Sequence, residues 1–274
     1  MIVYLVCIAK NENQYIQEWV CWYLSLGFDK IVICENNDPD GERIDLKDDR
    51  VEIVDYIGVD GVQSLAYTEQ FLRLRDECDW IFFADCDEFL VLNNDSNIKD
   101  FLSRDCFTGA DIVRINWRLY TGKDSGGSSV VERFKTEYRE HEQNKFTKSF
   151  IRSDIPFSDK NKIYGHGCYN KDLIAVNDIG VRCMNIRSES CKRLEEVDYT
   201  NAALNHYPTK TIEEFVRQKL FRGGPNRNPK RYDNFNYWLK YNPLDEEELE
   251  RGMKYAASYI SEDAGEDYNK GMIN

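Results

Sequence analysis

Apolar and polar residues alternate along the first 90 positions in a way that predicts strands and helices in turn. Residues 2–9 form a continuous apolar run, which is typical of a strand buried on both faces of a parallel sheet. From 16 to 24 apolar residues recur three and four positions apart, which predicts an amphipathic helix. Asn11 or Asn13 is expected to cap its start, and Gly27 is expected just beyond its end.

The same alternation continues to residue 84, where a five-residue apolar run ends. We expect strands over 30–34, 51–56 and 80–84 and a helix over 64–77. Strands that alternate with helices at this spacing imply right-handed crossovers and an α/β fold built on a mostly parallel sheet with flanking helices. Ligands of such sheets bind beyond the carboxyl ends of the strands.

Beyond residue 105 the pattern loosens. Strands are expected over 112–117, 146–152 and 163–166, and helices over 212–221 and 243–259. Residues 121–129 form a Gly/Ser stretch with nothing apolar to bury. We expect this stretch to be a mobile loop that closes over the substrates. We expect one large domain over 1–224 and a helical, aromatic extension over 225–274.

Charge and cysteine content narrow the class of partner. The chain has 36 basic and 49 acidic residues and a net charge of −13, which argues against nucleic acid as a partner. Nine cysteines without CxxC pairs favour reduced thiols in a cytoplasmic protein. The apolar start lacks a basic leader region, and no apolar run reaches the roughly 18 residues that span a bilayer.

The stretch WIFFADCDEFL, residues 80–90, carries the most informative chemistry, because three acids follow a buried strand directly. Asp85 and Asp87 are two positions apart, so both can bind one hard cation, for which oxygen ligands favour Mn²⁺ or Mg²⁺. An isolated DxD is more often a solvated turn. Here two further polar segments, 10–12 and 36–38, follow strands and are expected at the same edge of the sheet.

Several blocks together resemble the family-2-like and family-92-like glycosyltransferases. They are KNENQYIQEWVCWYLSLGFDKIVICENND from Lys10, WIFFADCDEFL, INW at 115–117, VVERF at 130–134, TKSFIR at 147–152 and NHYPTKTIEEFVRQKLFRGG at 205–224. The resemblance covers roughly residues 2–224 and implies the GT-A fold. It further implies transfer of a sugar from a nucleotide diphosphate sugar, with a divalent metal at the DxD acids and with inversion at the anomeric carbon.

The resemblance also implies roles for individual residues. The metal ligands would be Asp85 and Asp87, with His206 as a third, although a lone histidine is more often structural. Glu88 would orient a neighbouring group. The donor-binding residues would be Lys10, Asn11, Glu12, Asn36, Asp38, Asp85, Cys86, Lys219 and Arg222. Asn11 and Glu12 have a second interpretation as helix caps, and the two late cations a second interpretation as solvated surface charge.

The catalytic base is not singled out by the sequence. Inverting transfer needs a group that takes the proton of the acceptor hydroxyl, and the candidates are Glu132 and His166, with Asp124 third. Each has a plainer interpretation as a loop charge or a strand-end polar residue. Trp117 is a candidate for stacking on a sugar, whereas Trp19 lies on the apolar helix stripe and is expected in the core.

The expected partners are a UDP-sugar donor and a glycan or glycolipid acceptor met at the cytoplasmic face of a membrane. Peripheral contact with that membrane and self-association both remain open. Residues 232–241 form an aromatic cluster, but the acids at 245–250 would be repelled by anionic lipid. A second subunit or a packed core is therefore favoured as the environment of the tail.

Three other classes compete with this interpretation. A carbohydrate- or calcium-binding module without catalysis would bind metal but gain no stability from a nucleotide diphosphate. A nucleotidyltransferase would carry a Gly-rich, basic loop after its first strand, where this chain has Ala9 to Asn13. A phosphatase of the haloacid dehalogenase type would place Thr or Val after the second Asp, where this chain has Glu88.

Overall fold

The computed structural model describes residues 1–158, 161–170, 172–184, 193–220 and 235–263, with the side chains of the last helix described to residue 258. The chain divides into two compact units. Unit 1 comprises Met1–Arg118 and Arg139–His206, and unit 2 comprises Leu119–Tyr138 and Tyr207–Asn274. The expected boundary at 224 lies outside the described residues, and this division falls earlier in the chain.

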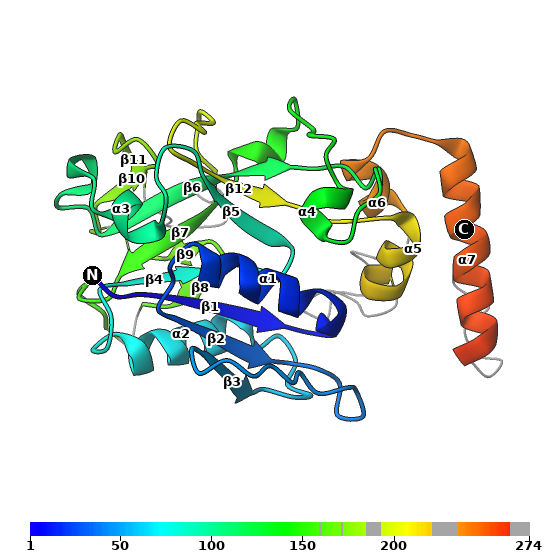
Figure 1. The fold of residues 1–274 in the computed structure, drawn as a ribbon, viewed down its shortest axis with the longest axis horizontal. Coiled ribbons are helices and arrows are strands. Elements are labelled where there is room, and N and C mark those ends of the chain that lie inside the picture. The colour runs from blue at the N-terminus through cyan, green and yellow to red at the C-terminus, as the bar shows by residue number, and fades with distance from the viewer. Residues whose placement is uncertain (159–160, 171, 185–192, 221–234, 264–274) are drawn as a thin grey trace. The chain divides into compact units, whose positions relative to one another are not determined.

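Unit 1 is built on a mixed sheet with the strand order β11-β10-β6-β7-β4-β1-β2-β3, and β12 pairs with β5 and β6 (Figure 1). The strands are β1 (Val3–Ala9), β2 (Lys30–Glu35), β3 (Val51–Asp55), β4 (Trp80–Phe83), β5 (Glu88–Leu92), β6 (Ile112–Leu119), β7 (Thr147–Arg152), β8 (Ile163–Tyr164), β9 (Gly167–Cys168), β10 (Ala175–Asn177), β11 (Arg182–Cys183) and β12 (Ala202–His206). Of these, β8 and β9 form a separate two-stranded sheet. Strands β4, β1, β2 and β3 are parallel, as the sequence predicted. The predicted α/β class, a sheet flanked by helices, is confirmed.

Helices α1 (Asn13–Ser25) and α2 (Gln63–Leu74) cover opposite faces of this sheet. Successive residues of a strand point to opposite faces. In β4, Phe82 stacks on Phe150 and contacts Tyr23 of α1, whereas Phe83 contacts Tyr67 of α2. The continuous apolar runs of the sequence are therefore explained by two apolar layers, one on each face.

The start of α1 differs from the expectation. Its N-cap is Glu12, without a side-chain cap, rather than Asn11 or Asn13. Asn11 adopts a positive φ of 54° and donates its backbone N–H to Asn37, and Asn13 donates to the carbonyl of Glu42. Contacts with the loop after β2 thus replace the local cap. Gly27, with φ of +89°, ends the helix as predicted.

Three strand predictions needed correction. The acids at 85–88 follow the carboxyl end of β4 as expected, but the chain turns there and continues directly into β5, an unpredicted strand that pairs antiparallel with β12. Strand β7 runs antiparallel between β4 and β6. The strand expected over 163–166 is only β8, half of a hairpin with β9. Among the described residues, α3 (Ile98–Leu102) and the 3-10 turns η1 (Asp105–Phe107) and η2 (Glu142–Lys145) complete the connections.

Unit 2 is helical, with α4 (Val130–Arg133), α5 (Ile212–Phe215), a π-helical turn η4 (Val216–Leu220), α6 (Asn236–Tyr241) and α7 (Glu246–Asp263). The helix predicted over 212–221 is present to residue 220, and residue 221 lies outside the described part. Ile212, Phe215 and Trp238 form a core against which Phe235 and Leu249 pack. The described part of the aromatic tail is therefore packed inside unit 2. A packed core was one of the two environments that the acids at 245–250 favoured over a membrane.

The Gly/Ser stretch is anchored at its base and exposed at its tip. Thr121 is buried, and the backbone N–H of Gly122 donates to the side chain of Asn242. Residues 123–128 are exposed. Arg133 holds the tip to the rest of unit 2, because its guanidinium pairs with Asp124 at 2.8 Å and with Glu214 at 2.8 Å.

Replacing Arg133 with alanine should loosen this loop and destabilise unit 2. The Glu214 side chain, 3% exposed, would lose its ion pair with Arg133, and we expect a cost of about 2 kcal/mol in the free energy of unfolding. Trypsin should cleave faster after Lys123. The matched control is Arg251→Ala, since Arg251 is 57% exposed and pairs with Glu213; it should cost less than about 1 kcal/mol. Equal cleavage rates in both variants would show that Arg133 does not hold the loop.

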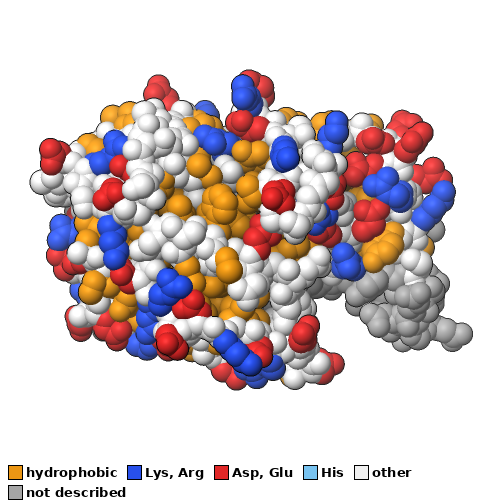
Figure 2. All heavy atoms as spheres, viewed as in Figure 1, with side chains coloured by type: hydrophobic (Ala, Val, Ile, Leu, Met, Phe, Trp, Pro, Cys, Tyr) orange, Lys and Arg blue, Asp and Glu red, His pale blue; other side chains and the backbone are white. Residues whose placement is uncertain are grey.

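Surface charge and thiols agree with the composition. Figure 2 shows acidic and basic side chains interspersed over the face in view, with no continuous basic patch among the described residues drawn there. The eight cysteines within the described ranges are free thiols. In the part of the chain that the structure describes, no helix combines the length and apolar character needed to cross a bilayer.

Candidate active site

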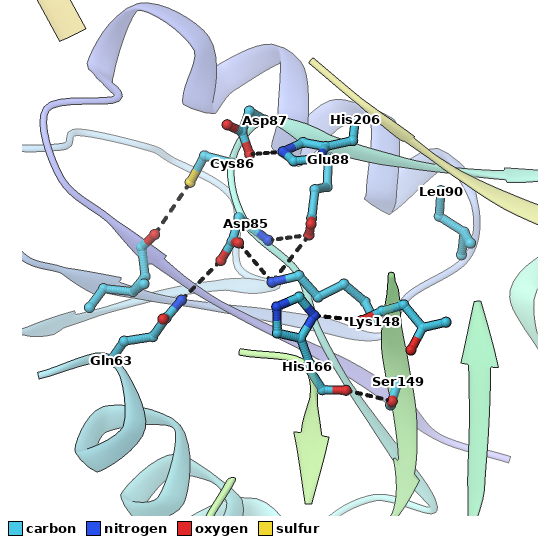
Figure 3. Close-up of polar contacts among 12 residues, drawn as sticks. Gln63, Asp85, Cys86, Asp87, Glu88, Leu90, Lys148, Ser149, His166 and His206 are labelled. Atoms are coloured by element: carbon cyan, nitrogen blue, oxygen red, sulfur yellow. Dashed lines mark hydrogen bonds and ion pairs between the residues drawn. The ribbon is translucent and has the colours of Figure 1, made fainter. Parts of the chain in front are cut away.

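The three acids lie on a tight turn between β4 and β5, at the carboxyl edge of the parallel strands (Figure 3). The backbone N–H of Glu88 donates to the carbonyl of Asp85 at 3.0 Å, and the N–H of Asp85 donates to Oε2 of Glu88 at 2.8 Å. Glu88 is fully buried, and burial raises its pKa well above the usual value. We call residues Asp85–Glu88 the acid turn.

A buried lysine that the sequence analysis did not select lies against the acid turn. Lys148 of β7 is 1% exposed, and its Nζ lies 2.7 Å from Oδ2 of Asp85 and 3.5 Å from Oε2 of Glu88. Burial alone would lower the pKa of Lys148, but the two carboxylates outweigh it and raise that pKa. The acid turn therefore has a positive charge held against it by β7.

The second oxygen of Asp85 is held by α2. Gln63 Nε2 donates to Oδ1 of Asp85 at 3.1 Å, and the Tyr67 hydroxyl lies 3.4 Å from the same atom. Both carboxylate oxygens of Asp85 thus have donors from the protein, and its position is fixed from the two neighbouring elements (Figure 3).

Asp87 instead faces a histidine. In the antiparallel register of β5 and β12, His206 lies opposite Glu88, and its Nε2 is 3.5 Å from Oδ1 of Asp87. Both side chains are largely buried, at 12% exposed for Asp87 and 8% for His206. The indole of Trp117 packs on the His206 ring, with 4.3 Å between the ring centroids. Strand pairing thus brings together two residues that the sequence separates widely.

His166 lies on the tip of the β8–β9 hairpin and is held by β7. Its Nδ1 is 2.8 Å from the carbonyl oxygen of Thr147, and its own carbonyl accepts from Ser149 Oγ at 2.8 Å. Because a carbonyl oxygen only accepts, Nδ1 carries the proton, and Nε2 carries the lone pair of the neutral ring. His166 thus has the tautomer that a general base at Nε2 requires.

The loops after β1 and β2 meet at the same edge, as parallel strands require. Lys10 Nζ pairs with Asp38 at 3.0 Å, and the side chain of Asn11 donates to Asp38 at 3.1 Å. Asn36 is buried and donates to the carbonyls of Tyr56 and Val59, so it shapes the loop.

Comparison with known proteins decides the family. A model of glycosyltransferase family 92 sequences matches residues 4–242. The chain belongs to glycosyltransferase family 92. A family 92 protein of Oryza sativa subsp. japonica is 28% identical over 102 residues, which are 35% of this chain and 18% of that protein. One of Ricinus communis is 25% identical over 128 residues, 44% of this chain and 23% of that protein. The alignments thus span less than a quarter of either relative.

Solved structures of S. aureus TarS are loosely similar. TarS 1–349 gives a TM-score of 0.38 at 10% identity, covering 96% of this chain and 73% of that one. Its complex with UDP-GlcNAc gives 0.41 at 11% identity, covering 95% and 72%. Nothing about the ligand of this family 92 chain follows from a likeness at this level.

The remaining candidates for proton transfer and late donor binding belong to unit 2 or lie outside the described residues. Glu132 is exposed in α4 of unit 2, where two hydrogen bonds from Ser128 lower the pKa of its carboxyl. Lys219 lies in unit 2, with its Nζ 6.0 Å from the centre of the Tyr237 ring. Arg222 lies outside the described residues. Asp124 pairs with Arg133.

Glu12, Cys86 and Trp117, which were expected to contact the substrates, are all buried. Glu12 is buried at the start of α1, and the Cys86 thiol points to the carbonyl of Ile8 in β1. Trp117 is 8% exposed and packs against Phe146, His166 and His206. Its expected role as an open platform for a sugar ring was therefore wrong.

A divalent cation fits the donors present at the acid turn. Asp87 and His206 present one carboxylate oxygen and one imidazole nitrogen to each other, a combination that Mn²⁺ accepts. Within the described residues no three His, Cys, Asp or Glu side chains are grouped as a complete ligand set. A cation here would thus take its other ligands from water and substrate, as Mg²⁺ and Mn²⁺ commonly do.

Proposed function

We propose that the protein transfers a hexose from a UDP-sugar to a hydroxyl group of a glycan or glycolipid, with inversion and with Mn²⁺ or Mg²⁺. Membership in family 92 supports sugar transfer. The observation that carries the proposal is the acid turn, which holds paired acids and a buried lysine at the edge where the loops after β1 and β2 also end. Ligands of open α/β sheets bind at this edge.

Asp87 and His206 are the residues that would hold the cation, with Asp85 beside them. When bound, the cation would supply positive charge for the diphosphate leaving group. Lys148 contributes a fixed charge of its own and keeps Asp85 in place. The leaving group gains negative charge as the glycosidic bond breaks, so charge fixed in a partly buried site lowers the barrier without reorganisation.

Proton transfer from the acceptor is assigned to His166. Its Nε2 would take the proton of the attacking hydroxyl while the Nδ1 proton stays on Nδ1, hydrogen-bonded to the carbonyl oxygen of Thr147. Glu132, the first candidate from the sequence, becomes the second, because the Ser128 hydrogen bonds that lower its pKa make it a weaker base.

The donor loops would bind the nucleotide. Lys10, Asn11 and Asp38 form a connected group that would meet the base and ribose, and Asn36 shapes the loop that carries Asp38. Glu12 stays a donor-binding candidate from the resemblance. Cys86, Lys219 and Arg222 remain donor-binding candidates from the resemblance alone. We further propose that the enzyme works in the cytoplasm near a membrane face, where it would meet such an acceptor.

Calorimetric titration with UDP, in saturating Mn²⁺ and without added metal, tests the proposal directly. We expect UDP to bind at least about tenfold more tightly with the cation present, and GDP to bind more weakly than UDP. Equal UDP affinity in both conditions would remove the metal from the mechanism. No binding of UDP in either condition would remove the donor assignment, and hydrolysis of a panel of UDP-hexoses identifies the sugar.

A further inference from the structure

Three aromatic side chains of α1 donate hydrogen bonds to the backbone of the acid turn and of β5. Trp19 Nε1 lies 3.1 Å from the carbonyl oxygen of Asp85 and 2.9 Å from that of Glu88. The Tyr23 hydroxyl is 3.1 Å from the same Glu88 carbonyl, and Trp22 Nε1 is 2.8 Å from the carbonyl of Leu90. The helix thus holds this segment through its carbonyl groups.

Trp19 differs from an ordinary core tryptophan in what its N–H contacts. A buried indole needs one acceptor, and any nearby carbonyl would satisfy it. Here the N–H is shared between the first and the last residue of the acid turn, and the indole is completely buried. Rotation of either peptide group would break one of these contacts.

The consequence concerns the direction of the carboxylates. With the carbonyls of Asp85 and Glu88 held toward α1, the side chains of Asp85 and Asp87 are directed to Lys148 and His206 (Figure 3). The turn is also closed by its own hydrogen bond from the Glu88 N–H to Asp85. Trp19 therefore controls the geometry of the acids without touching their carboxylates.

We propose that Trp19 is a positioning residue for the cation and diphosphate site, acting through the backbone of the acid turn. This inference rests on the proposed function, because it assigns Trp19 to the metal-coupled binding of a nucleoside diphosphate. Groups that orient metal ligands commonly change metal affinity by ten- to a hundredfold when they are removed.

The test is the variant Trp19→Phe, which keeps an aromatic ring in the core and removes the N–H. Mn²⁺ binding in the presence of UDP is measured by electron paramagnetic resonance, and UDP binding by calorimetry. We expect the half-saturating Mn²⁺ concentration to rise about tenfold, while UDP affinity without metal changes less than about twofold. The matched control is Trp22→Phe, which removes one indole N–H from the same helix, beyond the acid turn. It should leave Mn²⁺ affinity within about twofold.

The outcomes separate the inference from the proposed function. If the wild-type protein shows no coupling between Mn²⁺ and UDP, the proposed function fails and the role of Trp19 with it. If the wild-type protein shows coupling and both tryptophan variants lose thermal stability but keep the same Mn²⁺ affinity, Trp19 is only structural and the inference is overturned. If Trp19→Phe does not fold, Tyr23→Phe removes another donor to Glu88. It should weaken Mn²⁺ binding more than Trp22→Phe does, and equal effects would overturn the inference.

Discussion

Replacing Lys148 with methionine is expected to lower the free energy of unfolding by about 3 to 5 kcal/mol. The reason is that this change removes the buried cation that pairs with Asp85 and Glu88. Methionine fills a similar volume, so the loss reports on charge rather than on a cavity. Glu88 would then remain fully buried without the lysine, and Asp85, which is 35% exposed, would keep its hydrogen bond from Gln63. Denaturation by urea, followed by circular dichroism, measures the change.

Two further variants make this expectation specific. Arg152→Met at the end of the same strand removes a cation that pairs with Asp154 at the surface, and it should cost less than about 1 kcal/mol. The double variant Lys148→Met with Asp85→Asn should lose less stability than the sum of the two single variants, because both changes remove the same pair. If the effects are additive, or if Lys148→Met costs no more than Arg152→Met, the buried pair does not stabilise the turn.

The second large effect is expected when both acids of the DxD pair are neutralised. In Asp85→Asn with Asp87→Asn, UDP should bind with the same affinity with and without Mn²⁺. With Mn²⁺ present, the double variant should therefore bind UDP at least about tenfold more weakly than the wild-type protein does. Asparagine keeps the shape of aspartate, and its amide oxygen can still accept one of the hydrogen bonds that Gln63 and Lys148 donate to Asp85, so the fold should survive. Calorimetry gives the affinities and circular dichroism the fold.

The matched control is Asp45→Asn with Asp49→Asn, which changes the net charge equally at two exposed positions in the loop before β3. Its UDP affinity and metal dependence should equal those of the wild-type protein. If the control variant loses the coupling as fully as the DxD variant, the effect reflects overall charge. If the DxD variant keeps the coupling, the acid turn is not the metal site.

Much of the fold followed from local pattern. The strands from Val3 to Phe83 and the two helices between them were predicted with errors of a few residues at most, because buried parallel strands have continuous apolar runs and amphipathic helices have regular spacing. That pattern also predicted that the polar segments at 10–12, 36–38 and 85–88 would share one edge. The short strands β5 and β12 escaped detection, because their few residues carry no period that distinguishes a strand from a turn.

The buried lysine could have been suspected from its neighbours. Lys148 lies between apolar residues in a segment predicted as a strand, and lysine is seldom buried without a partner. No local pattern indicates which carboxylate it would meet, because 63 residues separate Lys148 from Asp85. Only the insertion of β7 as an antiparallel strand beside β4 brings the two together.

The sequence by itself therefore determined the class of the sheet, the edge at which the acids lie and, through its motifs, the family. The tertiary structure alone decided which residues meet there: Lys148 with Asp85, His206 with Asp87, and Trp19 with the backbone of the acid turn. The physical reason is that local periodicity specifies which face of an element is buried. The partner of each polar side chain is set by strand order and register, which depend on pairings between distant segments of the chain.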